Sequence, residues 1–175
     1  RVEPASESCD TVLQFPLASI TAPVLIDNIH YDFDRATLRP ESMAALDSLV
    51  TLLNTNPHVA IELSAHCDYK GKGDYNKRLS QRRAEAVAHY LTAHGISADR
   101  LTAVGYGKEQ PKTIKHRLAV CYPFLQENTV LTEDFIKTLT PEQQEICNQL
   151  NRRTEFRVTN TTYGMFDANG QLIRK

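Results

Sequence analysis

Three features are missing from this 175-residue chain, and each absence excludes a class of protein. No apolar run is long enough to span a bilayer as a helix, so no transmembrane segment is predicted. Lys and Arg (20) nearly balance Asp and Glu (21), and the net charge of -1 provides no strong field for binding nucleic acid or anionic lipid. The four cysteines include no CxxC pair, which argues against a structural zinc site.

The remaining composition is that of one globular domain. Hydrophobic residues make up 41% of the chain and charged residues 23%, and this length can bury a core without staples. The chain starts at Arg1, with neither Met nor an apolar signal region. We therefore expect a mature or excised piece of a longer protein.

Hydrophobic periodicity predicts strands that alternate with helices. Pro40 suits the first turn of a helix, and Gly95 suits a left-handed helix cap. The predicted strands cover residues 22–33, 58–65, 99–106 and 154–159, and the helices cover about 40–54 and 74–94. This order indicates an α/β fold with helices packed on one sheet. Residues 1–21 are expected to be a lead-in, 112–150 a helical insertion within a domain of 22–160, and 161–175 a tail.

One arginine interrupts an apolar helix face. Arg83 lies four residues after Leu79 and four before Val87, and burying an unpaired guanidinium is very costly. Asn76 lies two turns earlier on the same side, and Asp68 lies in the loop that leads into the helix. A carboxylate, an amide and a guanidinium would suit a small zwitterion. An internal Asp68–Arg83 ion pair without any ligand would explain the same residues, and both interpretations stay open.

The same loop carries residues that could support other chemistry. His66, Cys67 and Asp68 carry ligand-type atoms, but adjacent strand residues point to opposite faces and cannot all hold one metal. Cys67 as a nucleophile has no identifiable orienting group beyond His66. Glu62 with Asp68 or Asp32 could form a glycosidase-like carboxylate pair, but the sequence does not give their separation.

Two further patterns have simpler explanations. Asp32 and Asp34, at the end of the first strand, could be an acid/base pair, although a solvated strand end explains them as well. The Lys/Gly run at residues 70–73 lacks the spacing and the Ser/Thr of a phosphate loop, which favours a flexible turn.

Six ordered motifs together resemble a known family. They are YDFDRATL (31–38), HCD (66–68), NxxLSxxRA (76–84), GIxxxRL (95–101), GYG (105–107) and NRRxEF (151–156). The set is similar to the OmpA C-terminal-type peptidoglycan-binding domain over about residues 24–160. The resemblance implies a β-α-β-α-β fold with one mixed sheet, and a variable insertion before the final strand.

The resemblance also implies a function. The family binds the diaminopimelate-containing stem peptide of peptidoglycan without cleaving it, so the chain is expected to be neither an enzyme nor dependent on a cofactor. The expected location is the periplasm, with attachment to the outer membrane through regions that precede this chain. Two alternatives remain, a cell-wall hydrolase with paired carboxylates and a protein-interaction domain with a vestigial site.

The resemblance assigns site residues one by one. Asp68 is expected to accept from the diaminopimelate ammonium group, and Arg83 to bind its carboxylate in a bidentate manner. Cys67 stands where the family usually has Thr. Other expected contacts are Asp32, Phe33 and Asp34 beside the pocket, Asn76 and Leu79 lining it, and Arg152, which shares strand parity with the core-facing Phe156 and Val158.

The insertion suggests a narrower assignment. Residues 118–150 and the motif that follows them are similar to the PorE-like subgroup associated with type IX secretion. This similarity implies outer-membrane secretion-complex proteins as partners. A disulfide between Cys121 and Cys147 would staple the insertion in an oxidising compartment.

Overall fold

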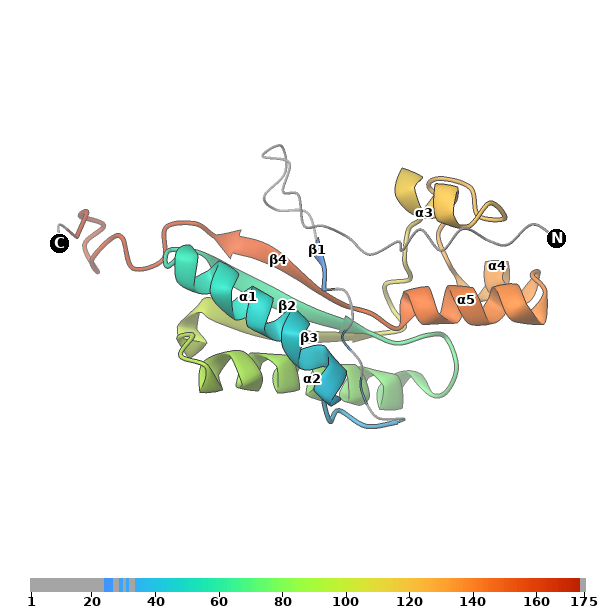
Figure 1. Cartoon of the computed structure of the whole chain (residues 1–175), viewed down its shortest axis with the longest axis horizontal. Helices are drawn as coiled ribbons and strands as arrows, with labels where there is room; N and C mark the ends of the chain where they lie inside the picture. Colours follow the sequence, from blue (N-terminus) through green and yellow to red (C-terminus); the bar gives the residue numbers. More distant parts are fainter. Residues whose placement is uncertain (1–23, 27–28, 30, 32–33, 174–175) are drawn as a thin grey trace.

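The centre of the fold is a four-stranded mixed sheet. The computed structural model describes residues 24–26, 29, 31 and 34–173 (Figure 1). The strands run in the order β1-β4-β2-β3, with β2 parallel to β3 and β4 antiparallel to both β1 and β2. The predicted α/β class with helices on one mixed sheet is confirmed. The strand bounds are β1 Val24–Leu25, β2 Ala60–His66, β3 Leu101–Gly107 and β4 Thr154–Asn160.

The first helix begins at a proline, as predicted. Pro40 starts a 3-10 turn, η1 (Pro40–Ser42), which continues into α1 (Met43–Thr55). The apolar side of α1 faces the sheet, because its leucines recur at helical spacing and are buried against Ile61 and Leu63 of β2. The buried leucines of α1 are Leu46, Leu49 and Leu53.

The second helix lies on the same sheet face. Helix α2 (Gly73–Ala93) buries Val87 and Leu91 in the core that α1 also covers, and Gly95 follows it with φ 92°. A 3-10 turn, η2 (Ala98–Arg100), then leads into β3. The predicted third strand therefore begins at Leu101 rather than at residue 99.

The insertion forms a separate small core beyond one end of the sheet. It contains α3 (His116–Cys121), α4 (Glu133–Lys137) and α5 (Pro141–Asn151), and Figure 1 shows these helices grouped at the end opposite residues 161–173. Thr140 and Gln143 form a reciprocal capping box that fixes the start of α5. The buried residues of this core are Ile114, Leu125, Leu131, Ile136 and Cys147.

Some predictions on the first strand and the termini change or remain untested. Within the predicted strand of residues 22–33, the described residues form β1 and an isolated bridge between Tyr31 and Leu38, and the others lie outside the described residues. The lead-in of residues 1–21 lies outside the described residues. No helix in the described ranges is both long and apolar enough to cross a bilayer.

The cysteines of the insertion do not pair with each other. Cys147 carries a buried free thiol in the small core, whereas Cys121 is disulfide-bonded. The predicted Cys121–Cys147 bridge is therefore wrong. Cys147 of α5 packs among apolar side chains and forms no disulfide with Cys121.

Candidate functional site

The candidate site lies where the carboxyl end of β2 meets the amino end of β4. Because these strands are antiparallel, the residues that follow β2 lie beside those that precede β4. Ala65 pairs with Thr154, and the His66 N–H donates to the Arg153 carbonyl at 2.9 Å. This register brings Asp68 and Arg152, 84 positions apart in sequence, into contact.

The Asp68 carboxylate is fixed from two sides. Its Oδ1 accepts from the Lys70 backbone N–H at 3.0 Å, and its Oδ2 accepts from Arg152 Nη1. The Asn76 amide donates to the Lys70 carbonyl at 2.7 Å, which ties the loop to the start of α2. Only 12% of the Asp68 side chain is exposed, so this recessed anion has a fixed position at the end of the sheet.

Arg83, the second charged residue predicted for the site, lies on α2 and is half-buried. Its Nε donates to the Arg35 carbonyl at 3.0 Å, and its guanidinium carbon lies 4.8 Å from the centre of the Tyr31 ring. The Tyr31 hydroxyl shares a 3.0 Å hydrogen bond with Thr154, and burial raises the pKa of Tyr31 to about 12. The ring is therefore a neutral, anchored platform for the guanidinium.

The predicted Asp68–Arg83 ion pair does not form. Asp68 pairs with Arg152 instead, and no carboxylate among the described residues pairs with Arg83. A carbonyl and an aromatic ring hold the Arg83 guanidinium but do not neutralise its charge. Of the two interpretations left open by the sequence, the internal Asp68–Arg83 pair is excluded.

Cys67 lies among the charges of the site. Burial raises the pKa of its thiol, and Arg83, Asp68, Arg152 and Asp34 all act on it electrostatically. Its Sγ donates to a backbone carbonyl of α2 at 3.5 Å. A buried thiol with a raised pKa is a poor nucleophile, which argues against catalysis by Cys67.

The insertion adds one carboxylate that the sequence did not indicate. Arg152 Nη2 donates to Glu145 Oε1 at 2.5 Å, and the other Glu145 oxygen lies 3.6 Å from Lys70 Nζ. Burial alone would lower the pKa of Arg152, but its hydrogen bonds to Glu145 and Asp68 raise it. The hydrogen bond from Arg152 lowers the pKa of Glu145. The spacing of seven residues between positions 145 and 152, two helical turns, is the signal that could have revealed this contact.

The remaining members of the HCD motif and of the closing motif face elsewhere. The His66 ring is buried, stacks on Tyr106 and lies 3.6 Å from Glu155. Glu155 in turn pairs with Arg153 and Lys112, so Arg153 is turned away from Asp68. His66, Cys67 and Asp68 thus contact three different groups and do not converge on one ligand position.

Other predicted site residues have varied positions. Asn76 and Leu79 are buried on α2, and Asp34 is exposed with φ 55°. The nearby Asp34 carboxylate raises the pKa of Tyr75. Asp32 and Phe33 lie outside the described residues.

Glu62 and Asp68 each interact with other side chains and not with one another. Glu62 accepts from the Tyr106 hydroxyl at 3.1 Å and from Arg157 at 2.9 Å, whereas Asp68 is paired with Arg152. Each carboxylate is thus held by its own hydrogen bonds. The alternative of a glycosidase-like carboxylate pair formed by Glu62 and Asp68 therefore lacks structural support.

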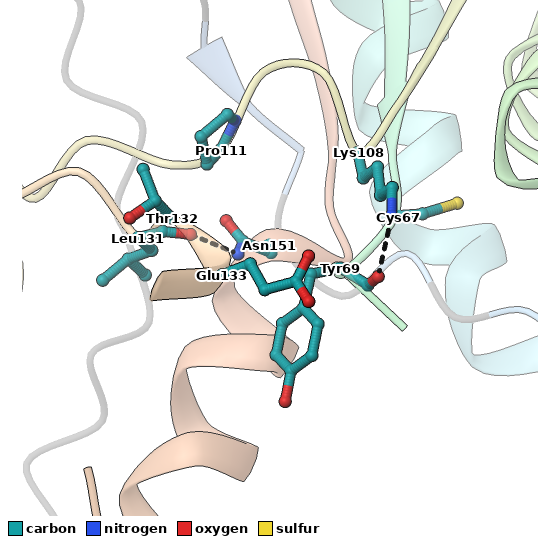
Figure 2. A pocket seen from close by; sticks show the side chains of 8 residues that line it. All are labelled: Cys67, Tyr69, Lys108, Pro111, Leu131, Thr132, Glu133 and Asn151. Atoms are coloured by element: carbon teal, nitrogen blue, oxygen red, sulfur yellow. Dashed lines mark hydrogen bonds between the residues drawn. The ribbon is translucent and has the colours of Figure 1, made fainter. Parts of the chain in front are cut away.

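A cavity of about 240 Å³ lies between the residues that follow β2 and β3 and those of the insertion. Figure 2 shows the Cys67 sulfur directed away from the other lining side chains. Lys108 Nζ contacts the Tyr69 carbonyl at 3.4 Å across one wall. The lining residues are Cys67, Tyr69, Lys108, Pro111, Leu131, Thr132, Glu133 and Asn151.

Comparison with known proteins gives the family. Residues 30–119 match the sequence model of the OmpA family, which is half of the chain. The chain belongs to the OmpA family. The match ends at residue 119, so α4, α5 and β4 lie beyond it.

Two curated relatives illustrate the similarity. Outer membrane protein A of Shimwellia blattae is 41% identical over 91 residues, which cover 51% of this chain and 38% of that protein. The peptidoglycan-associated lipoprotein of Pasteurella multocida is 34% identical over 90 residues, or 51% of this chain and 60% of the relative. The chain thus spans less than two thirds of these relatives.

Solved structures support the same fold. The peptidoglycan-associated lipoprotein from Burkholderia pseudomallei has a TM-score of 0.53 at 24% identity, covering 75% of this chain and 88% of that one. The cell wall anchor of the T6SS from Pseudomonas aeruginosa has a TM-score of 0.52 at 22% identity, with 79% of both chains covered. At these identities the likeness concerns the fold alone.

Proposed function

We propose that this chain is a non-catalytic module that binds peptidoglycan through the diaminopimelate residue of the stem peptide. The observation that carries the proposal is a recessed anion beside a cation that no described carboxylate neutralises. Asp68 and Arg83 both act electrostatically on the buried Cys67 thiol, whose Sγ contacts a backbone carbonyl of α2. The free end of diaminopimelate carries an ammonium group and a carboxylate, which match these two charges.

The roles of the residues follow from their contacts. In the proposed complex, the Asp68 carboxylate accepts from the ligand ammonium group, and the Arg83 guanidinium binds the ligand carboxylate from its Tyr31 platform. Asn76 holds the Asp68 loop in position, because its amide bonds the Lys70 carbonyl. Leu79, Asp34 and Arg152 border the site, and Asp32 and Phe33 are proposed to complete it.

The names of several relatives support peptidoglycan as the ligand. Those named peptidoglycan-associated lipoproteins include the proteins of Pasteurella multocida and Haemophilus influenzae, at 34% and 33% identity. A module of this kind would act in the periplasm and link an outer-membrane-associated assembly to the cell wall.

Calorimetric titration with a diaminopimelate-containing muropeptide tests the proposal. Asp68→Asn and Arg83→Gln should each weaken binding tenfold or more, since truncating one partner of a recessed charge pair costs about 2–5 kcal/mol. Arg82→Gln and Asp74→Asn are matched controls, because both residues are exposed on α2 and the charge changes are the same. Unchanged affinity in Asp68→Asn and Arg83→Gln would reject the proposed site.

We also propose the assembly that the module anchors. The similarity of the insertion and its following motif to the PorE-like subgroup supports a secretion complex of the type IX class. Co-sedimentation of this complex with purified cell wall provides the test. The Asp68→Asn variant should release the complex from the wall, whereas retention of the complex would contradict this assignment.

A further inference from the structure

We propose that Glu145 of the insertion is a positioning residue that retains Arg152 when a cationic group displaces Arg152 from Asp68. The inference rests on the proposed function and concerns the control of the same site. Its basis is the bridging geometry of one guanidinium. Arg152 donates through Nη1 to Asp68 and through Nη2 to Glu145.

Arg152 acts as an internal substitute for the ligand cation. It occupies Asp68 Oδ2, while Oδ1 accepts from the Lys70 N–H, so both oxygens of the recessed carboxylate have partners. An arriving ammonium group must displace Arg152 or share Oδ2 with it. Without a second anion, displacement would leave the Arg152 charge unpaired beside the incoming cation.

Glu145 supplies that second anion. It lies on the solvent side of Arg152, as the exposed side-chain fractions increase from 12% for Asp68 to 34% for Arg152 and 48% for Glu145. When Arg152 leaves Asp68, it can keep its bond to Glu145 and move outward. The Glu145 carboxylate then offsets the positive charge that would otherwise repel the ligand ammonium group.

The fold holds this pair in a fixed geometry. Glu145 and Arg152 are two turns apart on one side of α5, and the Arg152 N–H donates to the Asn148 carbonyl at 3.0 Å. The capping box fixes the first turn of the same helix. The OmpA family match ends at residue 119, so the insertion adds Glu145 to a site whose acid and α2 arginine lie within the match.

Glu145→Gln is the direct test, with Glu142→Gln as its control. Glu142 lies one turn earlier on α5, is exposed, and forms no ion pair with any described residue. Calorimetry should show that Glu145→Gln weakens binding of the diaminopimelate-containing muropeptide about two- to fivefold. This is the range expected for a half-exposed ion pair. Glu142→Gln should bind like the native chain. A muropeptide with its free side-chain amine acetylated should show no Glu145 effect, because it lacks the cation.

A double-mutant cycle separates this role from a general charge effect. Arg152→Gln removes the internal cation and should bind the muropeptide more tightly than the native chain. Adding Glu145→Gln to Arg152→Gln should then have much less effect than Glu145→Gln alone. Thermal unfolding of each variant checks that α5 remains folded.

The outcomes are distinguishable. Equal affinities for Glu145→Gln and Glu142→Gln would overturn the inference. So would an equal loss of affinity on adding Glu145→Gln to the native chain and to Arg152→Gln. In both cases the native chain still binds, and the proposed function stands. If the native chain does not bind the muropeptide, the proposed function and the inference fail together.

Discussion

The backbone of α2 lies so close to β3 at Gly105 that adding a single methyl group there should destabilise the fold. A Cβ at this position would lie 2.1 Å from the Gln81 nitrogen and 2.6 Å from the Ser80 carbonyl carbon, whereas ordinary contacts begin at 3.4 Å. The obstacle is helix backbone, which cannot rotate away as a side chain can. Gly105→Ala therefore forces α2 away from β3.

The cost can be worked out from these contacts. Moving α2 by roughly 1 Å forfeits a quarter to a half of the dispersion attraction of each affected contact. The move also strains the bonds by which Gln81 accepts from the Gly105 N–H at 2.8 Å and donates to the Ala103 carbonyl at 3.1 Å. Overpacking typically costs about 1–3 kcal/mol and each lost hydrogen bond about 1 kcal/mol. We expect a loss of roughly 3–5 kcal/mol in the free energy of unfolding.

Urea unfolding followed by circular dichroism measures this loss, and Gly73→Ala is the matched control. A Cβ at Gly73 would meet only the Lys108 Cε, at 4.0 Å, so this variant should stay within about 0.5 kcal/mol of the native chain. Because α2 carries Asn76 and Arg83, Gly105→Ala should also weaken muropeptide binding where it remains folded. Equal midpoints and equal m-values for both variants would refute the packing argument.

Two further predictions concern buried polar side chains. Burial, reinforced by Arg153, lowers the pKa of His66 from 6.5 to about 4, so folding favours the neutral imidazole. The resulting stability is fully present above pH 6.5 and is lost as the pH falls towards 4. Urea titrations should show a loss of about 2 kcal/mol between pH 7.5 and pH 5 that is smaller in His66→Gln; an identical loss would contradict this assignment. Asn148 is fully buried, and neither of its side-chain polar atoms has a hydrogen-bond partner in the part of the chain that the structure describes. Asn148→Leu should raise the melting temperature, because it removes a desolvation cost of about 1–3 kcal/mol, and a lower melting temperature would show that Asn148 is satisfied in solution.

The sequence predicted the elements whose signals are local. The apolar spacing of residues 74–94 and the following Gly95 indicated α2, which spans Gly73–Ala93. Alternating residues indicated β4 to within one residue at its end. These signals depend on neighbours in sequence, so they do not require knowledge of the tertiary structure. The described part of the first predicted strand, β1, pairs with β4 through Val24 and Leu25.

The partner of Asp68 could not be predicted in the same way. The contact with Arg152 depends on the antiparallel register of β2 and β4, which the sequence does not state. The strand-parity argument for Arg152 was wrong in its premise, because Arg152 caps α5 with φ -77° and ψ 81° and is not part of β4. Glu145 was missed because the insertion was interpreted only as a helical connection.

Arg100 and Arg83 are both at least partly shielded from solvent but differ in how many of their nitrogens have described acceptors. Arg100 is the more deeply buried of the two, at 7% exposure, yet its nitrogens donate to the carbonyls of Leu53, Asn56 and Val59. Those carbonyls lie at and just beyond the end of α1, where a cation is favourable, so Arg100 has a structural role. Arg83 differs, since only its Nε donates to a described residue. Burial of an arginine therefore does not by itself indicate a ligand. The stronger indication at Arg83 is the pair of terminal nitrogens without described acceptors, in the geometry that a carboxylate can bind with both oxygens.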